Sequence, residues 1–506
     1  MIKLIYRIES DYMSKKRMLI VTSVILSVVT ISLGIVKLYQ TYALSNYIGA
    51  ETDTGIDVYI NDDSYASIPA NGSSNVYYML TNTNPGTVKY GVAYQTTSGV
   101  TVKVYDTSED PATGTIEENG KKYIKLRLEN SNSTNKTIEL STVLGYENGG
   151  DLVVPSGVTL VTDTYTPPPT AAEYITKLYT DASKTTVTNN SITYNTAPSV
   201  SLMNDRLGST STGIDSGNIR YYGASPKNYI YFNCSDYSNQ TSSTCETWRI
   251  IGVFDGKLKL IRGSQIGRYA WDNKNTSTGA ESVNGKNDWT TARLMKLLNP
   301  SDYYTTDSND NNLGQSLYYN SASGKCYSGQ NNATVDCDFT STGIKNAETR
   351  NMIAETTYNL GGWTDSKIYP NQIYGYERGT TVYTGRPTTP WTGKIALAYP
   401  SDYGYAADLN QCKDKTLYDY DNSTCTSNNW MKAIITNNRN NYGWLLTPYS
   451  GDSNYVWYVL SSGYVLNNRY AYYAIGAVPV LSLSSELGIE SGNGDGSSSN
   501  PYKLSA

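Results

Sequence analysis

The side chains that could do chemistry in this sequence are cysteines and carboxylates, because the chain has no histidine. Without imidazole there is no Ser-His-Asp or Cys-His nucleophile, no His-Glu-x-x-His zinc site and no histidine general base. The 45 acidic residues leave open a carboxylate-pair reaction of the glycoside hydrolase type, although no pair stands out. The sequence therefore indicates no catalytic residue, no metal ligand and no cofactor.

The six cysteines fall as three close pairs: Cys234/Cys245, Cys326/Cys337 and Cys412/Cys425. Other pairings are possible, but this clustering favours three local disulfides. Each would close a polar loop and stabilise the fold by about 3 kcal/mol in the chain-entropy model. A zinc site would need the shorter Cys-x₂₋₄-Cys spacing. Free structural thiols are the alternative, and an anaerobic habitat would favour them.

A second candidate site is the aromatic segment between residues 440 and 473. The chain has 48 Tyr against 3 Phe, and here Tyr and Trp occur with Asn, Ser and Gly, the composition of an antibody-like contact surface. We expect Trp444 and Trp457 to pack in the core instead. The predicted ligand-binding residues are Asn454, Tyr455, Asn467, Asn468, Arg469, Tyr470 and Tyr472.

The N-terminal region predicts a membrane anchor. Residues 18–36 are free of charge and long enough, at 1.5 Å per residue, for the ~30 Å hydrocarbon core. Basic residues precede this run, and after Lys37 none follows until Lys89. The positive-inside rule then gives a cytoplasmic stub over 1–17, one membrane helix over 18–36 and an extracellular bulk. A cleaved signal peptide is the alternative. With pI ≈ 5.1, no nucleic-acid partner is expected.

Residues 51–162 predict a β-sandwich of immunoglobulin-like type. Apolar residues alternate with polar ones in segments such as Val88–Tyr94, Val100–Val104 and Ile124–Leu128, and turn-forming Asn and Gly residues separate them. About seven short strands at this spacing are typical of such sandwiches. We interpret the domain as a stalk.

Residues 163–212 are predicted to be a linker, and residues 213–506 a different domain. Prolines 167–169 indicate a stiff hinge, Thr170 is a plausible N-cap for a short helix over 171–178, and a polar stretch follows. All eight Trp and all six Cys lie in 213–506. Helices are expected at 290–298 and 344–358 among short strands and long loops, which favours an α+β domain.

Several blocks of this region stand in a distinctive order: Ile219–Gly223, Asn228–Asn233, Trp248–Val253, Lys259–Arg262, Ile395–Ala406, Trp444–Pro448 and Gly476–Leu483. In order and spacing they resemble an uncharacterised family of surface-protein domains from gut Gram-positive-type bacteria, over more than half of the chain. The resemblance implies the C-type-lectin-like fold of formylglycine-generating enzymes, with a ligand-binding loop face. The reactive cysteine pair of those enzymes has no local match here, so no catalytic residue is carried over. The sugar and calcium motifs of animal lectins are also missing.

The predicted fold class is thus a membrane helix plus an all-β immunoglobulin-like sandwich plus an α+β C-type-lectin-like domain. The predicted function is that of a single-pass cell-membrane protein whose adhesin-like head binds an extracellular glycan or protein. One alternative is a cell-surface glycoside hydrolase, which needs two carboxylates in one cleft. Another is a structural envelope or pilus component.

Overall fold

The computed structural model describes residues 44–52, 55–57, 65–82, 86–145, 152, 154–207, 217–273, 284–306, 313–328, 333–383, 386–387, 389–437, 442–490, 492 and 494–505. They belong to two compact units, one up to Pro168 and one from Pro169 onward. The predicted stub at 1–17 and the predicted anchor at 18–36 lie outside the described residues. Within the described ranges, no helix is long and apolar enough to cross a membrane.

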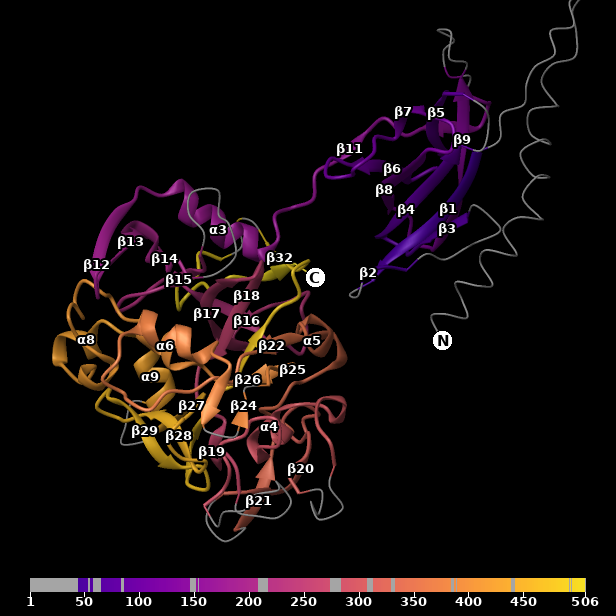
Figure 1. Cartoon of the computed structure of the whole chain (residues 1–506). Helices are drawn as coiled ribbons and strands as arrows, with labels where there is room; N and C mark the ends of the chain where they lie inside the picture. Colours follow the sequence, from indigo (N-terminus) through magenta and orange to yellow (C-terminus); the bar gives the residue numbers. More distant parts are fainter. Residues whose placement is uncertain are drawn as a thin grey trace, which may run out of the picture. The chain divides into compact units, whose positions relative to one another are not determined.

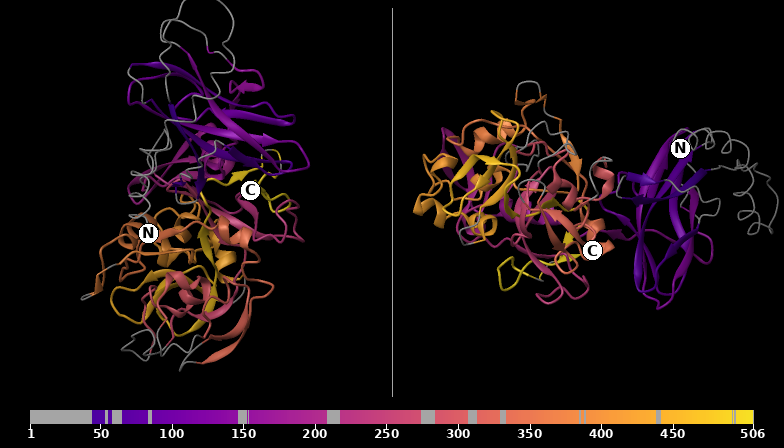
Figure 2. Two further views of the ribbon diagram at one scale, coloured as in Figure 1. Left: turned by 90° about the vertical axis from the view of Figure 1, so that its right-hand side faces the viewer. Right: turned by 90° about the horizontal axis from the view of Figure 1, so that it is seen from below.

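The first unit consists of two β-sheets that share one core (Figures 1 and 2). In the strand at Lys121–Asn130 the apolar residues Ile124, Leu126 and Leu128 are buried, while the residues between them are half-buried. This period of two lets one face of each sheet pack inward. Tyr78 and Tyr90 are fully buried in the same core.

The strands of the first unit are the following. One sheet has the order β11 (Thr164–Tyr165), β6 (Val100–Tyr105), β8 (Lys121–Asn130), β4 (Gly72–Asn82), β1 (Leu44–Thr52) and β2 (Gly55–Asp57). The other has the order β10 (Val158–Leu160), β5 (Val88–Gln95), β9 (Lys136–Gly145) and β3 (Tyr65–Ile68), with β7 (Thr113–Ile116) also paired to β5. Three of the predicted alternating segments coincide with β5, β6 and β8.

The second unit is built on a nine-stranded sheet with a mostly apolar centre. Its order is β12 (Thr185–Asn189), β13 (Ile192–Ala197), β14 (Leu202–Asn204), β15 (Ile219–Tyr221), β17 (Glu246–Phe254), β18 (Lys257–Arg262), β31 (Val480–Ser482) and β26 (Ile395–Ala396), with β16 (Tyr229–Phe232) also paired to β17. The β17–β18 pairing contains an irregularity between Ile250 and Gly252. A Cβ at Gly252 would collide with the backbone carbonyl of Ile219, so this close approach of β15 and β17 requires glycine.

A second, five-stranded sheet follows in the same unit. Its order is β19 (Gly267–Ala270), β30 (Ala474–Ala477), β27 (Gly443–Pro448), β28 (Tyr455–Val459) and β29 (Val465–Tyr470). Four two-stranded pairs complete the strands: β20 (Ser323–Tyr327) with β21 (Thr334–Asp338), β22 (Thr356–Tyr358) with β25 (Trp391–Gly393), β23 (Thr381–Tyr383) with β24 (Arg386–Pro387), and β32 (Gly488–Ile489) with β33 (Leu504–Ser505).

The helices are short. The described α-helices are α3 (Ala171–Asp181), α4 (Arg293–Leu298), α5 (Ala347–Met352), α6 (Pro370–Glu377), α7 (Pro400–Tyr405), α8 (Ser423–Ser427) and α9 (Trp430–Thr436). The described 3₁₀ turns are η1 (Pro198–Val200), η3 (Ser301–Tyr303) and η4 (Leu417–Asp419). Thr170 caps α3 as predicted, in a capping box with Glu173. Figure 1 shows α9 beside the strands β27 and β28.

A buried ion network connects the main sheet to α7. Arg220 of β15 pairs with Asp205 (2.5 Å) and with Asp402 of α7 (2.9 Å), and Lys259 of β18 pairs with Asp402 (2.5 Å). Although burial opposes ionisation, Lys259 and Arg220 hold the pKa of Asp402 below its ordinary value. Because removing one member would leave a buried charge unpaired, the network locks β15, β18 and α7 together.

The three disulfides are confirmed in the predicted local pairing, Cys234–Cys245, Cys326–Cys337 and Cys412–Cys425. Cys326 and Cys337 lie on the paired strands β20 and β21. The other two bonds close loops in the second unit, and all six cysteines are buried.

The predicted fold class is wrong. The described chain is mostly β-sheet with seven α-helices, the longest of 11 residues, and none of them is a membrane helix. The second unit is therefore not the α+β domain that its loops and helical patterns favoured. The helix expected at 344–358 is reduced to α5, because Thr356–Tyr358 extends to pair with β25. Residues 171–204, assigned to the linker from the sequence, form α3 and β12–β14 within the second unit.

Candidate functional site

Five tyrosines gather around the paired strands β28 and β29, and we call them the tyrosine cluster: Tyr449, Tyr455, Tyr470, Tyr472 and Tyr473. The register sets Tyr455 opposite Tyr470, and their ring centroids are 4.5 Å apart. Tyr472 stacks on Tyr470 at 5.4 Å with an interplanar angle of 10°, and Tyr473 lies 4.7 Å from Tyr472. Tyr449 contacts Tyr455 at 5.9 Å. Except for the buried Tyr472, the tyrosines of the cluster are half-buried.

Arg469 adjoins the tyrosine cluster. Its guanidinium lies 4.3 Å from the ring centroid of Tyr473, 5.0 Å from that of Tyr442 and 5.8 Å from that of Tyr458. Among the described residues no carboxylate pairs with Arg469, and its Nε has no hydrogen-bond partner. Cation–π contacts of this kind stabilise the arginine and leave its charge available.

The phenol of Tyr455 is a neutral hydrogen-bonding group at physiological pH. The hydrogen bond with Tyr470, together with burial and neighbouring charges, raises the pKa of Tyr455 to about 12. A neutral phenol can both donate and accept a hydrogen bond, and its ring offers apolar area with few rotatable bonds. The surface is therefore suited to contacts with sugar rings or with polar protein surfaces.

The structure brings together only part of the predicted binding set. Tyr455, Tyr470, Tyr472 and Arg469 are adjacent. Asn468 is exposed nearby and accepts a hydrogen bond from Tyr458 (3.2 Å). The side chains of two other predicted residues, Asn467 and Asn454, form hydrogen bonds within the fold.

Asn467 is 9% exposed and donates to the carbonyl of Thr364 (2.8 Å), so its amide holds β29 against the loop before α6. Asn454 donates from its backbone and side chain to Asp452, which fixes the turn before β28. Trp444 and Trp457 are fully buried, which confirms their predicted core role.

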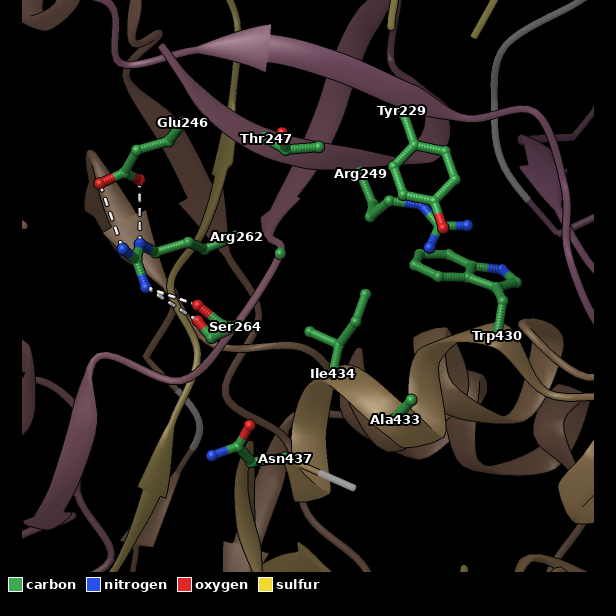
Figure 3. Close-up of a pocket in the computed structure, with 11 residues that line it drawn as sticks. Tyr229, Glu246, Thr247, Arg249, Arg262, Ser264, Trp430, Ala433, Ile434 and Asn437 are labelled. Carbon is green, nitrogen blue, oxygen red and sulfur yellow. Dashed lines mark hydrogen bonds and ion pairs between the residues drawn. The ribbon is translucent and has the colours of Figure 1, made fainter. Parts of the chain in front are cut away.

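A second candidate site is a pocket of about 510 Å³, which we call the arginine pocket (Figure 3). One wall comes from β16, β17 and β18, and the other from α9. The lining residues are Tyr229, Glu246, Thr247, Arg249, Arg262, Gly263, Ser264, Trp430, Ala433, Ile434 and Asn437. The sequence did not indicate this site.

Arg249 is the central charge of the arginine pocket. In Figure 3 its guanidinium lies between the rings of Tyr229 and Trp430, whose centroids are 3.7 Å and 4.9 Å from its central carbon. Its Nε donates to Asn228 Oδ1 (2.6 Å) and Nη2 to the carbonyl of Pro226 (3.4 Å). Burial lowers the pKa of Arg249 to about 10, with Tyr229 opposing that effect. The side chain still carries its charge at neutral pH.

The other charged side chains of the pocket are paired with each other. Arg262 forms a two-point contact with Glu246, at 2.9 Å and 3.1 Å, and also donates to Ser264 Oγ (2.9 Å). Bidentate arginine–carboxylate pairs of this geometry are strong and rigid. The charge of Glu246 is therefore balanced by that of Arg262. The pocket as a whole has a net positive charge, which comes from Arg249.

Two carboxyl groups in the second unit have strongly raised pKa values, but neither lines the arginine pocket. Burial raises the pKa of Asp272 to about 7 and that of Glu377 to about 7. Asp272 accepts the backbone N–H of Lys286 (2.8 Å), and Glu377 accepts the N–H and hydroxyl of Ser401. Both are completely buried and serve the packing around them. In the described ranges there is also no cluster of three or more acidic or cysteine side chains that could hold a metal ion.

One signal in the sequence could have indicated the pocket. Arg249 interrupts the apolar run from Trp248 to Val253, and an arginine in a buried strand requires partners. Those partners, Asn228 and Trp430, are brought in by other elements, so the sequence alone does not identify them. Comparison with protein-family models and with curated proteins finds no match for this chain. The resemblance to the bacterial surface domains therefore stays a prediction.

Proposed function

We propose that this chain is an extracellular binding protein whose second unit recognises a glycan or protein ligand through the tyrosine cluster and Arg469. The observation that supports it is the continuous set of tyrosine rings, most of them half-buried, beside a cation that has no ion-pair partner among the described residues. Three disulfides in this unit favour an oxidising compartment outside the cytoplasm.

The rings suit recognition because their packing against one another already restricts side-chain rotation. Tyr470 is held between Tyr455 and Tyr472, so little side-chain freedom remains to be lost when a ligand binds. Each ring adds apolar contact area, and each hydroxyl adds a directional hydrogen bond. Arg469 adds one positive charge, which favours ligands that carry an acidic or hydroxyl-rich group.

The test is an array of glycans and of extracellular proteins probed with the purified chain. We expect binding to a restricted set of ligands, and the double substitution Tyr455→Ser with Tyr470→Ser should weaken it at least tenfold. Tyr123→Ser is the matched control, because Tyr123 is also a partly exposed strand tyrosine (39%) but lies in the first unit. Circular dichroism checks that each variant is folded.

Three results would contradict this proposal. Equal binding by the cluster variant and the Tyr123 control would show that the cluster is not the contact surface. Turnover of an array glycan, abolished by substituting a pair of acidic residues, would favour the glycoside hydrolase instead. Filaments of the purified chain in negative stain would favour a structural role.

A further inference from the structure

We propose that the arginine pocket binds the carboxylate of an acidic sugar residue and that Arg249 is the ion-pair partner of that carboxylate. This site shares no residue with the tyrosine cluster, so it is a separate contact of the second unit. Its ligand class follows from three features: a buried cation without a counter-ion, the direction in which that cation is accessible, and the polar rim around it.

The first feature is the lack of a counter-ion. Arg249 is 6% exposed, and no carboxylate in the described part of the chain lies within ion-pair distance of it. Burying a cation is costly unless it is paired. The other buried arginine of this sheet, Arg220, has two carboxylates. Arg249 has only neutral acceptors, which leaves the attraction for an anion unsatisfied.

The second feature is the direction of approach. Tyr229 and Trp430 cover the two faces of the guanidinium, so an anion can approach only in its plane. Nε donates to Asn228 and Nη2 to Pro226, and the Tyr229 hydroxyl also interacts with the guanidinium, so the protein offers it only neutral partners. In-plane pairing to a planar carboxylate is the geometry in which arginine binds most strongly. The aromatic walls therefore select a flat anion.

The third feature is the polar rim. Thr247, Ser264 and Asn437 line the pocket and are exposed, and they supply hydroxyl and amide groups around the apolar side chain of Ile434. A volume of about 510 Å³ lies in the range of roughly 300–1,000 Å³ that is typical of small-molecule sites. Several neutral donors and acceptors around one cation match a sugar ring that carries several hydroxyls and one carboxylate.

The experiment is saturation-transfer difference NMR with the purified full chain. The probes are glucuronate and N-acetylneuraminate, with glucose as the neutral sugar and acetyl-dialanine as a carboxylate on a peptide. We expect saturation of the acidic sugars, no saturation of glucose and at most weak saturation of the peptide. Arg249→Met should weaken acidic-sugar binding at least tenfold. Arg268→Met is the matched control, because Arg268 is an exposed arginine outside the pocket.

A second pair of variants keeps the test decisive if Arg249→Met does not fold. Asn437 lies at the rim with a left-handed backbone (φ 50°), which Asp and Gly both tolerate. Asn437→Asp places a negative charge in the pocket and should weaken acidic-sugar binding at least tenfold, whereas Asn119→Asp, at an exposed left-handed asparagine of the first unit (φ 58°), should leave it unchanged.

The outcomes that overturn the proposal are distinct. Glucose binding as well as glucuronate would remove the role of the carboxylate. The peptide binding better than both acidic sugars would assign the pocket to peptide carboxylates. Unchanged affinity in Asn437→Asp or in a folded Arg249→Met would place the ligand elsewhere. Loss of acidic-sugar binding in the Tyr455/Tyr470 variant, with binding retained in a folded Arg249→Met, would assign the acidic sugar to the tyrosine cluster and overturn the proposal.

Discussion

Glu377 and Asp272 are carboxyl groups that the fold keeps away from water. Glu377 accepts hydrogen bonds from the backbone and hydroxyl of Ser401 at the start of α7, and Asp272 accepts from the backbone of Lys286. Burial dominates in both cases and raises each pKa to about 7. Both groups therefore link proton uptake to folding, because an unfolded chain would release the same protons near pH 4.

We predict that the free energy of unfolding falls as the pH rises from about 4 to about 7. A carboxyl whose folded pKa is raised contributes stability that is complete below about pH 4 and lost as pH rises through about 7. Each group adds a slope of about 1.4 kcal/mol per pH unit between those limits. Urea unfolding at intervals between pH 4.5 and 8, followed by tryptophan fluorescence, measures the slope.

Glu377→Gln should reduce that slope by about half, because the amide keeps the contacts with Ser401 and no longer titrates. Asp272 then accounts for the remainder. Glu173→Gln is a matched control, since Glu173 is exposed at the first turn of α3 and should leave the slope unchanged. A Glu377→Gln profile identical to the parent would refute the assignment.

At the residue scale the sequence predicts some features and not others. The local cysteine pairs were predictable because loop spacing alone favours them. The burial of Asn467 is not predictable, because alternation along β29 does not show which face is covered, and the Asn467 amide bonds to Thr364. Arg249 was missed because its surroundings come from Asn228 and Trp430, which lie far from it in the chain.

At the element scale, β17 depends on Gly252. A methyl group there would meet the carbonyl of Ile219, and neither strand can move without disturbing the sheet. We predict that Gly252→Ala destabilises the second unit by about 1–3 kcal/mol, the range for overpacked sites. Thermal unfolding measured by tryptophan fluorescence shows the change.

The matched control is Gly375→Ala in α6. A Cβ at Gly375 has nothing within 4 Å, and alanine is the better helix former by about 1 kcal/mol. It should leave the unfolding temperature unchanged or raise it. Equal effects of the two substitutions would mean that the close approach of β15 and β17 can relax.

Elements were predictable where local signals were complete. α3 has its cap, and α4 lies within the expected range 290–298. The polar stretch at 185–197 was interpreted as linker, yet β12 and β13 form a hairpin across Asn190 and Ser191, both with positive φ. Threonine-rich strands are polar enough to look like a linker, and only their pairing in the main sheet distinguishes them.

At the scale of the whole molecule, the two units differ in what holds them together. All six cysteines and all eight tryptophans lie in the second unit. Residues 44–168 depend on two β-sheets and one apolar core. Reducing conditions should therefore affect only one of the units.

We predict that a reductant lowers the urea midpoint of the second unit and leaves that of the first unchanged. Each disulfide contributes about 3 kcal/mol in the chain-entropy model. Tryptophan fluorescence follows the second unit alone, and circular dichroism follows both. The same titration on the first unit alone, residues 44–168, is the control. A single transition in both signals, or a shift of the first unit, would contradict independent units.

The two ends of the second unit meet in its core. Thr170, directly before α3, bridges to Gly488, and Leu504 is buried and bonded through its backbone to the side chain of Gln240. The nine-stranded sheet is incomplete until β31 (Val480–Ser482) has left the ribosome. The strands described in the first unit end at residue 165, so this unit can fold early during synthesis, before the second unit is complete. Folding helpers that shield exposed apolar segments would act mainly on the later-made part.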